Sequence, residues 1–397
     1  MTTVATTKLK ETEIGPIPEG WDVATIAQVG KVVTGKTPSR DNPDDWGDDF
    51  DFITPTDITS DEKYVSSVSR RISKIGAARF GTMIIPPESV LVTCIGSDMG
   101  KVVMNREKCL ANQQINSIIP KENLENDFVY YALKNLYQTL WDHAGGGSTM
   151  PIINKSTFES LSIVIPRLVN EQKQIAEILS SLDDKIELNR IINTNLEKLA
   201  ATLFKKWFVD IEDELPEGWR IGTFGEAVEN FDSKRIPLSS MERKPGSYPY
   251  YGATSIMDYV EDYIFDGTYV LLGEDGSVAK EDGKPFVQYV SGKIWVNNHA
   301  HVLRGKNGFS TEYIKVFLDQ VNITPFVTGA VQPKLNQANM NSISMIIPDQ
   351  KTLTKFNEVL TALFGMILEN ENQTKNLEQV RNSLLPRLMS GKIRVKI

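Results

Sequence analysis

The sequence predicts an α+β fold in which two similar mixed α/β domains are joined by two long antiparallel coiled-coil helices about a pseudo-twofold axis. Three observations support this prediction: segments recur about half a chain apart, a heptad pattern follows each domain, and the domains alternate short apolar runs with glycine, proline and aspartate. With 397 residues, 41% of them hydrophobic, each half is long enough to bury a core of its own.

The repeat occupies nearly the whole chain. Pro18-Glu-Gly-Trp21 recurs as Pro216-Glu-Gly-Trp219, and Ser148-Thr-Met-Pro-Ile-Ile-Asn154 resembles Ala330-Val-Gln-Pro-Lys-Leu-Asn336. The separation between matching segments shrinks through the first part of each unit and is then steady. Each unit therefore has a variable front and a constant back, so we expect a shared frame that differs where a ligand is read.

The fronts, residues 1–168 and 211–348, are predicted to be α+β domains because short apolar runs end at glycine, proline and aspartate turns. The clearest strands are expected at Ser89–Cys94 and Thr268–Leu272, and the clearest helices at Asp127–Trp141 and Thr311–Val321.

The backs, residues 169–210 and 349–397, are predicted to be long spacer helices, the second ending in a basic tail. Apolar side chains recur at alternating steps of four and three, as the a and d positions of a coiled coil do. A helix of about 34 residues is about 50 Å long and cannot bury such a stripe alone, so we expect the two helices to pack on each other. The predicted seam is Ile175, Leu179, Leu182, Ile186, Asn189, Asn193, Leu196, Ala200, Leu203 and Trp207 in the first helix, and Phe356, Leu360, Leu363, Ile367, Asn370, Thr374, Leu377, Arg381, Leu384 and Leu388 in the second.

Polar residues interrupt each seam near its middle, at Asn189 and Asn193 and at Asn370 and Thr374. A buried asparagine costs stability but fixes register, so we hypothesise that Asn189 and Asn370 lie close together near the pseudo-twofold axis. The alternative is that these positions face solvent on an imperfect seam.

Composition and charge exclude several classes of protein. No signal-like start or membrane-length apolar run is present, and Cys94 and Cys109 form no ligand-spaced cluster, so we expect a cytoplasmic protein without a membrane partner. The net charge of -8 disfavours nucleic-acid binding if it is spread evenly. It is uneven, however: five basic residues and no acid lie between Arg381 and the end, and six aspartates lie between Asp41 and Asp51.

The segment from Gly30 to Thr37 matches the phosphate-loop pattern of nucleotide-binding enzymes. Pro38 and Pro43 oppose the helix that such a loop requires, so we predict a basic loop whose Lys36 and Arg40 contact DNA or are simply solvated. The aspartate run lacks a calcium-loop pattern and is expected to be a solvated acidic loop. We find no methyltransferase motif and expect no catalytic residue, metal ion or cofactor.

His299 and His301 lie two residues apart on a probable strand and are expected to share a face. Two ligands without a third are weak evidence for a metal site, so we expect surface or core histidines, with base contact by His299 as the lesser alternative. The repeated proline segment offers donors suited to phosphates and base edges, and its alternative role is a glycine hinge that docks the domain on its long helix. The remaining candidate DNA contacts are Ser148, Lys155, Lys234, Arg235, Gln332 and Lys334.

Several motifs together resemble the specificity subunit of type I restriction–modification systems. They are the Pro-Glu-Gly-Trp starts, the Gly-Ser-Thr-x-Pro-x-x-Asn segment, Ile-Pro before the Glu171-Gln-x-x-Ile-Ala helix, Leu203-Phe-Lys-Lys-Trp-Phe-Val-Asp210, and the ending from Leu384 to Val395. The resemblance implies that each front is a target-recognition domain reading one half of a split, asymmetric site in double-stranded DNA, and that the helices set the spacing. It also implies two methyltransferase subunits, which bind S-adenosylmethionine and methylate adenine, and two ATP-using restriction subunits that can join them.

The long helices also carry apolar residues away from the seam, at Ile178, Ile192, Leu199, Phe204 and Phe208. We expect these to dock the partner subunits, or alternatively to contact the chain's own recognition domains. Two rival functions remain open: a duplicated protein-binding scaffold without DNA specificity, and a phosphate-loop NTPase.

Overall fold

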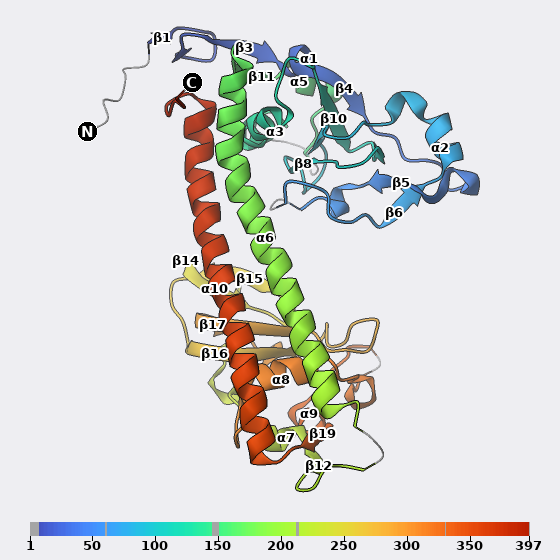
Figure 1. Ribbon diagram of the computed structural model, residues 1–397, viewed down its shortest axis with the longest axis vertical. Helices are drawn as coiled ribbons and strands as arrows, with labels where there is room; N and C mark the ends of the chain where they lie inside the picture. The colour runs from blue at the N-terminus through green and yellow to red at the C-terminus, as the bar shows by residue number, and fades with distance from the viewer. Residues whose placement is uncertain (1–7, 60–61, 145–150, 212–213, 330, 397) are drawn as a thin grey trace. The chain divides into compact units, whose positions relative to one another are not determined.

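The computed structural model describes residues 8–59, 62–144, 151–211, 214–329 and 331–396. It divides into two compact units: unit 1 is Met1–Asn189 with Asn372–Ile397, and unit 2 is Arg190–Glu371. The two long helices, α6 (Val169–Phe208) and α10 (Gln350–Met389), span 40 residues each, and half of each belongs to each unit (Figure 1).

Unit 1 holds a four-stranded antiparallel sheet of order β4-β10-β7-β8. A three-stranded sheet, β6-β5-β9, forms a lobe with α2, and β3 pairs with β11 beside the start of α6. The strands are β1 (Leu9–Lys10), β2 (Ile17–Pro18), β3 (Trp21–Thr25), β4 (Gly30–Thr34), β5 (Trp46–Ile53), β6 (Arg70–Ile72), β7 (Val90–Thr93), β8 (Val102–Met104), β9 (Cys109–Ala111), β10 (Ile115–Pro120) and β11 (Ser162–Pro166). The short helices are α1 (Ile26–Val29), α2 (Lys74–Arg79), α3 (Asn126–Lys134), α4 (Tyr137–His143) and α5 (Lys155–Ser160).

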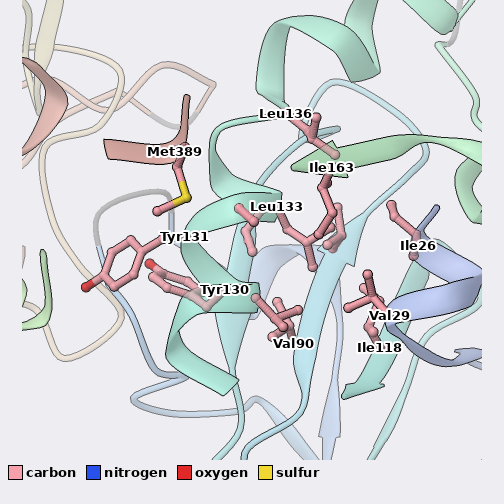
Figure 2. Close-up of a cluster of buried hydrophobic side chains, with 14 of the residues drawn as sticks. Ile26, Val29, Val90, Ile118, Tyr130, Tyr131, Leu133, Leu136, Ile163 and Met389 are labelled. Carbon is pink, nitrogen blue, oxygen red and sulfur yellow. The ribbon is translucent and has the colours of Figure 1, made fainter. Parts of the chain in front are cut away.

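The main core of unit 1 joins the sheet, α3 and the long helices. Tyr130, Tyr131 and Leu133 of α3 lie among buried strand residues and Met389 of α10 (Figure 2). Ile175 from α6 belongs to the same cluster. The front of unit 1 is therefore packed directly on both long helices.

Unit 2 holds a six-stranded sheet of order β13-β18-β16-β17-β14-β15, antiparallel except between β14 and β17. As in unit 1, a separate antiparallel pair, β12 with β19, flanks the long helix. The strands are β12 (Arg220–Thr223), β13 (Val228–Asn230), β14 (Pro245–Tyr251), β15 (Ile256–Val260), β16 (Phe265–Gly273), β17 (Val287–Val296), β18 (Ala300–Gly305) and β19 (Ser344–Ile347), and the short helices are α7 (Phe224–Ala227), α8 (Thr311–Leu318) and α9 (Gln337–Asn341).

The predicted front elements are present with shifted ends. The strand expected at Ser89–Cys94 is β7, and that expected at Thr268–Leu272 lies within β16. The helix expected at Asp127–Trp141 is two helices, α3 and α4, and the one expected at Thr311–Val321 is α8, which ends at Leu318.

Every residue of the predicted seam is buried or half-buried within its unit. Asn189 Nδ2 donates to Gln373 Oε1 at 2.9 Å in unit 1, and Asn370 Nδ2 donates to Asn193 Oδ1 at 2.8 Å in unit 2. Rising numbers on α6 meet falling numbers on α10, so the helices are antiparallel (Figure 1).

The polar breaks therefore hydrogen-bond across the seam, which excludes the solvent-facing alternative. Asn189 belongs to unit 1 and Asn370 to unit 2. Their predicted proximity and the predicted pseudo-twofold axis depend on how the two units are placed, so both stay predictions.

Two of the five apolar residues away from the seam follow the alternative expectation, contact with the chain's own recognition domain. Phe204 and Phe208 are buried in unit 2, with ring centroids 5.4 and 5.3 Å from that of Tyr313 in α8. They contact the chain's own recognition front because α8 packs on the last turns of α6. Ile178 and Leu199 are exposed, and Ile192 is half-buried.

The Pro-Glu-Gly-Trp starts join each front to its long helix. In unit 1, Trp21 Nε1 donates to Glu171 Oε1 in the first turn of α6 at 3.1 Å. In unit 2, Trp219 Nε1 donates to Asp349 Oδ2, immediately before α10, at 2.9 Å. The repeated tryptophan is therefore a structural anchor in both units.

The basic tail is partly turned inward. Arg394 pairs with the buried carboxylate of Glu171 at 2.8 Å, and Arg381 pairs with Asp183 at 2.6 Å with both side chains almost wholly buried. Ile393 packs against the core of unit 1. Arg381 and Arg394 are therefore structural, and their charges are paired within unit 1.

Candidate nucleic-acid interface

Four separate segments meet at one edge of each front, and we call this the loop edge. In unit 1 it comprises residues 34–40, 94–96, 112–115 and 151–154. In unit 2 it comprises residues 230–236, 273–276, 297–300 and 331–336. Most of the candidate DNA contacts from the sequence fall on or beside these segments, although they are far apart along the chain.

The repeated proline segment closes the loop edge in the same way in both units. Pro151 O accepts from Gly96 N at 2.9 Å, and Pro333 O accepts from Gly276 N at 3.0 Å. Both glycines have positive φ, +89° and +73°, a conformation that glycine adopts without strain.

The next residues of that segment turn the chain into a short helix. Ile153 and Leu335 are buried in the cores, and the side chains of Asn154 and Asn336 cap α5 and α9 by accepting from backbone N–H groups at 2.9 and 2.8 Å. The segment thus docks on the sheet-edge turn rather than on the long helix. Gly145 to Gly147 and Ser148 lie outside the described residues.

The phosphate-loop match is a strand and a packed turn. Residues Gly30–Thr34 form β4, and the next two backbone amides are already used: Gly35 N donates to Ile115 O at 3.1 Å and Lys36 N to Ala111 O at 2.8 Å. A side chain at Gly35 would collide with the Ala111 carbonyl. A phosphate loop needs free amides and a following helix, so this segment is not one.

The aspartate run was expected to be a solvated acidic loop, and this is only partly correct. Asp41, Asp44, Asp48 and Asp49 are exposed, but the run is not a loop throughout. Its second half is strand β5, and Asp45 is fully buried, with Arg79 Nη1 at 2.9 Å from its carboxylate. Burial occurs because α2 lies over this residue, and Gly76 of α2 leaves no space between them.

The unit 1 candidates are exposed. Lys36 and Arg40 lie on the loop edge, with Lys36 Nζ 5.9 Å from the centroid of the Phe80 ring. Lys155 is the first residue of α5, and its Nζ lies 3.5 Å from Glu159 Oε1. Lys36 and Arg40 form no ion pair with the residues that the structure describes, so their charges are available to a ligand.

The unit 2 candidates divide into exposed and structural residues. Lys234 and Gln332 are exposed, and Lys334 Nζ lies 3.3 Å from Glu274 Oε1. Arg235 is only 12% exposed and donates to Glu274 Oε2 at 2.7 Å and to Ala300 O at 2.6 Å. Its donors hold the loop edge together.

His301 is a core histidine at the same edge, as one of the expectations had it. Its Nδ1 lies 2.5 Å from Asp232 Oδ2 and its Nε2 lies 2.7 Å from Leu335 O, so both ring nitrogens face oxygen acceptors. Burial alone would raise the pKa of Asp232, but the hydrogen bond and charge of His301 outweigh it and lower that pKa.

Asp232, Glu274 and His301 have ligand atoms within 4.8 Å of one another, a spacing that a metal ion could use. Every one of these groups is already engaged: Arg235 and Lys334 bind Glu274, and His301 binds Asp232. We interpret the group as an ion-pair network that stabilises the loop edge.

A turn held by equivalent hydrogen bonds presents one side chain in each unit. Gln114 N donates to Asn112 Oδ1 at 2.8 Å, and His299 N donates to Asn297 Oδ1 at 2.8 Å. Gln114 O accepts from Cys94 N, and His299 O accepts from Glu274 N, both at 2.8 Å. Gln114 was missed in the sequence, where the available signal was an asparagine two residues before it.

Comparison with known proteins decides the family. The profile described as "Type I restriction modification DNA specificity domain" matches residues 18–198 and 216–379, and each match begins at the proline of a Pro-Glu-Gly-Trp start. The chain belongs to this family. It is a type I restriction–modification specificity subunit with DNA-recognition domains.

Relatives that match over nearly the whole chain or over part of it support the assignment of this specificity subunit. The chain is similar to the type I restriction enzyme MjaIX specificity subunit of Methanocaldococcus jannaschii, at 29% identity over 98% of this chain and 97% of that protein. A putative type I restriction enzyme specificity subunit of Haemophilus influenzae is 36% identical over 36% of this chain and 37% of that protein.

A solved structure shows the same fold. The S subunit of a type I restriction–modification system from M. genitalium matches with a TM-score of 0.55 and 18% identity, over 97% of this chain and 99% of that chain. Among the described residues of the specificity subunit, no helix combines the length and the apolar character needed to cross a membrane.

Proposed function

We propose that this specificity subunit reads a bipartite, asymmetric site in double-stranded DNA, each unit recognising one half through its loop edge. The chain contributes no catalysis. Two methyltransferase subunits bound to it modify adenine in the site, and two ATP-using restriction subunits join the complex for cleavage.

One observation carries the proposal: the two loop edges share a backbone frame but differ in their side chains. The turn that presents Gln114 in unit 1 presents His299 in unit 2 with the same hydrogen bonds. A scaffold for two identical partners needs no such difference, whereas reading two unlike half-sites requires different groups on equal frames.

The long helices are proposed to set the distance between the half-sites and to dock the methyltransferase subunits. Ile178 and Leu199 are exposed on α6 away from the seam, and Leu188 and Ile191 are exposed on the same helix. Exposed apolar side chains at several turns of a helix are suited to bind a protein partner.

Footprinting of the assembled complex tests the reading role. We expect two short protected blocks of DNA separated by an unprotected gap, and protection without sequence preference would favour the scaffold instead. Lys36→Ala should leave any ATP hydrolysis by the isolated chain unchanged, because the amides of its loop are engaged. Hydrolysis that depends on Lys36 would contradict the non-catalytic assignment.

Matched insertions test the spacing role. Because α6 and α10 pack on each other, one heptad must be added to both helices to keep the seam in phase. Seven residues add about 10 Å of helix, which corresponds to about three base pairs of DNA at about 3.4 Å each. The gap should lengthen by that amount while both half-site sequences stay the same, and altered half-sites would show that the helices themselves read bases.

A further inference from the structure

We propose that Gln114 and His299 are the base-reading side chains at equivalent positions of the two units, with Gln114 reading an A·T pair and His299 a G·C pair. This inference rests on the proposed function. It assigns a specificity-determining residue to each half-site.

The first argument is the equivalence of the two turns. An asparagine side chain two residues earlier, Asn112 or Asn297, accepts the backbone N–H of the presented residue. The presented residue's carbonyl accepts from the strand-end turn that also meets the repeated proline segment. These two hydrogen bonds, with the bond from the strand-end glycine to the proline segment, fix each turn before any ligand arrives, so the position of the presented residue is set in advance.

The second argument is accessibility. The His299 side chain is 46% exposed, although its neighbour two residues later, His301, is 1% exposed. Gln114 is half-buried, and its side-chain amide forms no hydrogen bond with the described residues, so both its donor and its acceptor are available. A glutamine amide with both groups available can bond to N6 and N7 of adenine at once.

The third argument is the chemistry beside each turn. The residue before the positive-φ glycine is Ile95 in unit 1 and Asp275 in unit 2, and each bridges to the proline segment, at Ile152 and Lys334 respectively. Ile152 is 48% exposed. An apolar side chain contacts the thymine methyl group, which complements an adenine contact by the glutamine.

In unit 2 the same place is charged. Asp275 Oδ1 lies 2.5 Å from His299 Nδ1, so the imidazole donates from Nδ1 and is held with Nε2 away from the carboxylate. Lys334 lies across the bridge from Asp275. A neutral imidazole that donates from Nδ1 accepts at Nε2, which suits the N4 amino group of cytosine. The lysine ammonium is a donor, and guanine presents two acceptors, O6 and N7, in the major groove, so the two side chains together suit a G·C pair.

The test exchanges the two side chains in the complete complex with its partner subunits. Target sequences of the wild type, Gln114→His and His299→Gln are determined by selection from random DNA and by mapping methylated adenines. We expect Gln114→His to weaken preference at one A·T position, by about 5- to 150-fold for the loss of a bidentate contact. His299→Gln should weaken preference at one G·C position of the other half-site. Each variant should leave the opposite half-site unchanged.

Gln138→His is the matched control, because it makes the same change at an exposed residue of α4, away from the loop edge. Its target should equal that of the wild type. Should an exchange variant fail to assemble, Gln114→Ala and His299→Ala remove the reading groups without adding bulk and carry the same expectation.

Three outcomes are distinguishable. If the wild-type complex shows no sequence preference, the proposed function itself fails. If it is sequence-selective and both exchanges leave both half-sites unchanged, the assignment of Gln114 and His299 is overturned while the function stands. If one exchange alters both half-sites, the side chains act on the shared frame and do not read bases.

Discussion

Removing Arg381 should destabilise unit 1 strongly, because it strands a buried carboxylate. The Arg381 and Asp183 side chains are 4% and 5% exposed, and Arg381 Nη1 donates to Asp183 Oδ1 at 2.6 Å. In Arg381→Met, the hydroxyl of Tyr131, at 2.7 Å, is the side-chain hydrogen-bond partner that Asp183 keeps among the described residues. Breaking a buried pair from one side costs about 3–5 kcal/mol, a large part of the about 5–15 kcal/mol that stabilises a typical domain.

Replacing both Asp183 and Arg381 with apolar residues should restore the stability that the single variant loses. In the register of Asn195-Leu-Glu197 with Asn376-Leu-Glu378, unit 2 has Phe364 where unit 1 has Asp183, and Ala200 where unit 1 has Arg381. Both are buried in the apolar core of unit 2. The double variant Asp183→Leu with Arg381→Met should therefore unfold within about 1 kcal/mol of the wild type or be more stable, as apolar replacements of buried ion pairs often are.

Urea unfolding combined with hydrogen exchange measures the stability of the single and the double variant in each unit separately. Residues 372–389 of α10 belong to unit 1 and residues 350–371 to unit 2, so faster exchange in the first segment alone reports a local loss. Arg167→Met is the control, because it breaks a solvent-exposed pair with Asp22 that should contribute little to stability. A cost below about 1 kcal/mol for Arg381→Met, or a double variant as unstable as the single, would refute the reasoning.

Three further predictions concern caps, acid and thiols. Asn154→Ala and Asn336→Ala should each lower the free energy of unfolding by about 1 kcal/mol, measured in urea, because each removes a helix cap; an unchanged midpoint would contradict the capping role. Hydrogen bonds from Thr352 lower the pKa of Asp349 from 3.8 to about 2. The stability that the ionised Asp349 contributes is therefore complete above about pH 4 and is lost as the pH falls through about 2. Asp349→Asn should flatten the pH dependence of the melting temperature between these values, and an unchanged slope would contradict this role of Asp349. Burial raises the pKa of Cys94 to about 12 and also raises that of Cys109, so neither should react with iodoacetamide at pH 8 until the chain unfolds.

Local patterns accounted for the long helices and the two-unit organisation. The heptad seam depends only on spacing along one helix, so every predicted seam residue is found buried or half-buried. The repeated Asn154 and Asn336 were visible for the same reason, although their capping role was not. The prediction of one helix over residues 127–141 was wrong because the chain turns at Asn135 and Leu136 between α3 and α4, and no proline or glycine marks that turn.

The candidate site depended on contacts between distant segments. Arg235 was a DNA candidate by its charge, but Glu274, 39 residues away, buries it in an ion pair. Phe204 and Phe208 were candidate docking residues in the sequence, but their rings pack against Tyr313 of α8 in the structure. The signal for Gln114 in the sequence was an asparagine two residues before it, and its match to His299 follows only from the hydrogen bonds of the folded turns.

The sequence by itself determined that this chain is a duplication with two heptad helices and no recognisable catalytic motif, because repeats, periodicity and motifs are properties of short stretches of chain. Only the tertiary structure decided which charged and polar residues remain available to DNA. That outcome depends on which distant side chains compete for the same hydrogen bonds, and such competition exists only once the loops of each unit have met.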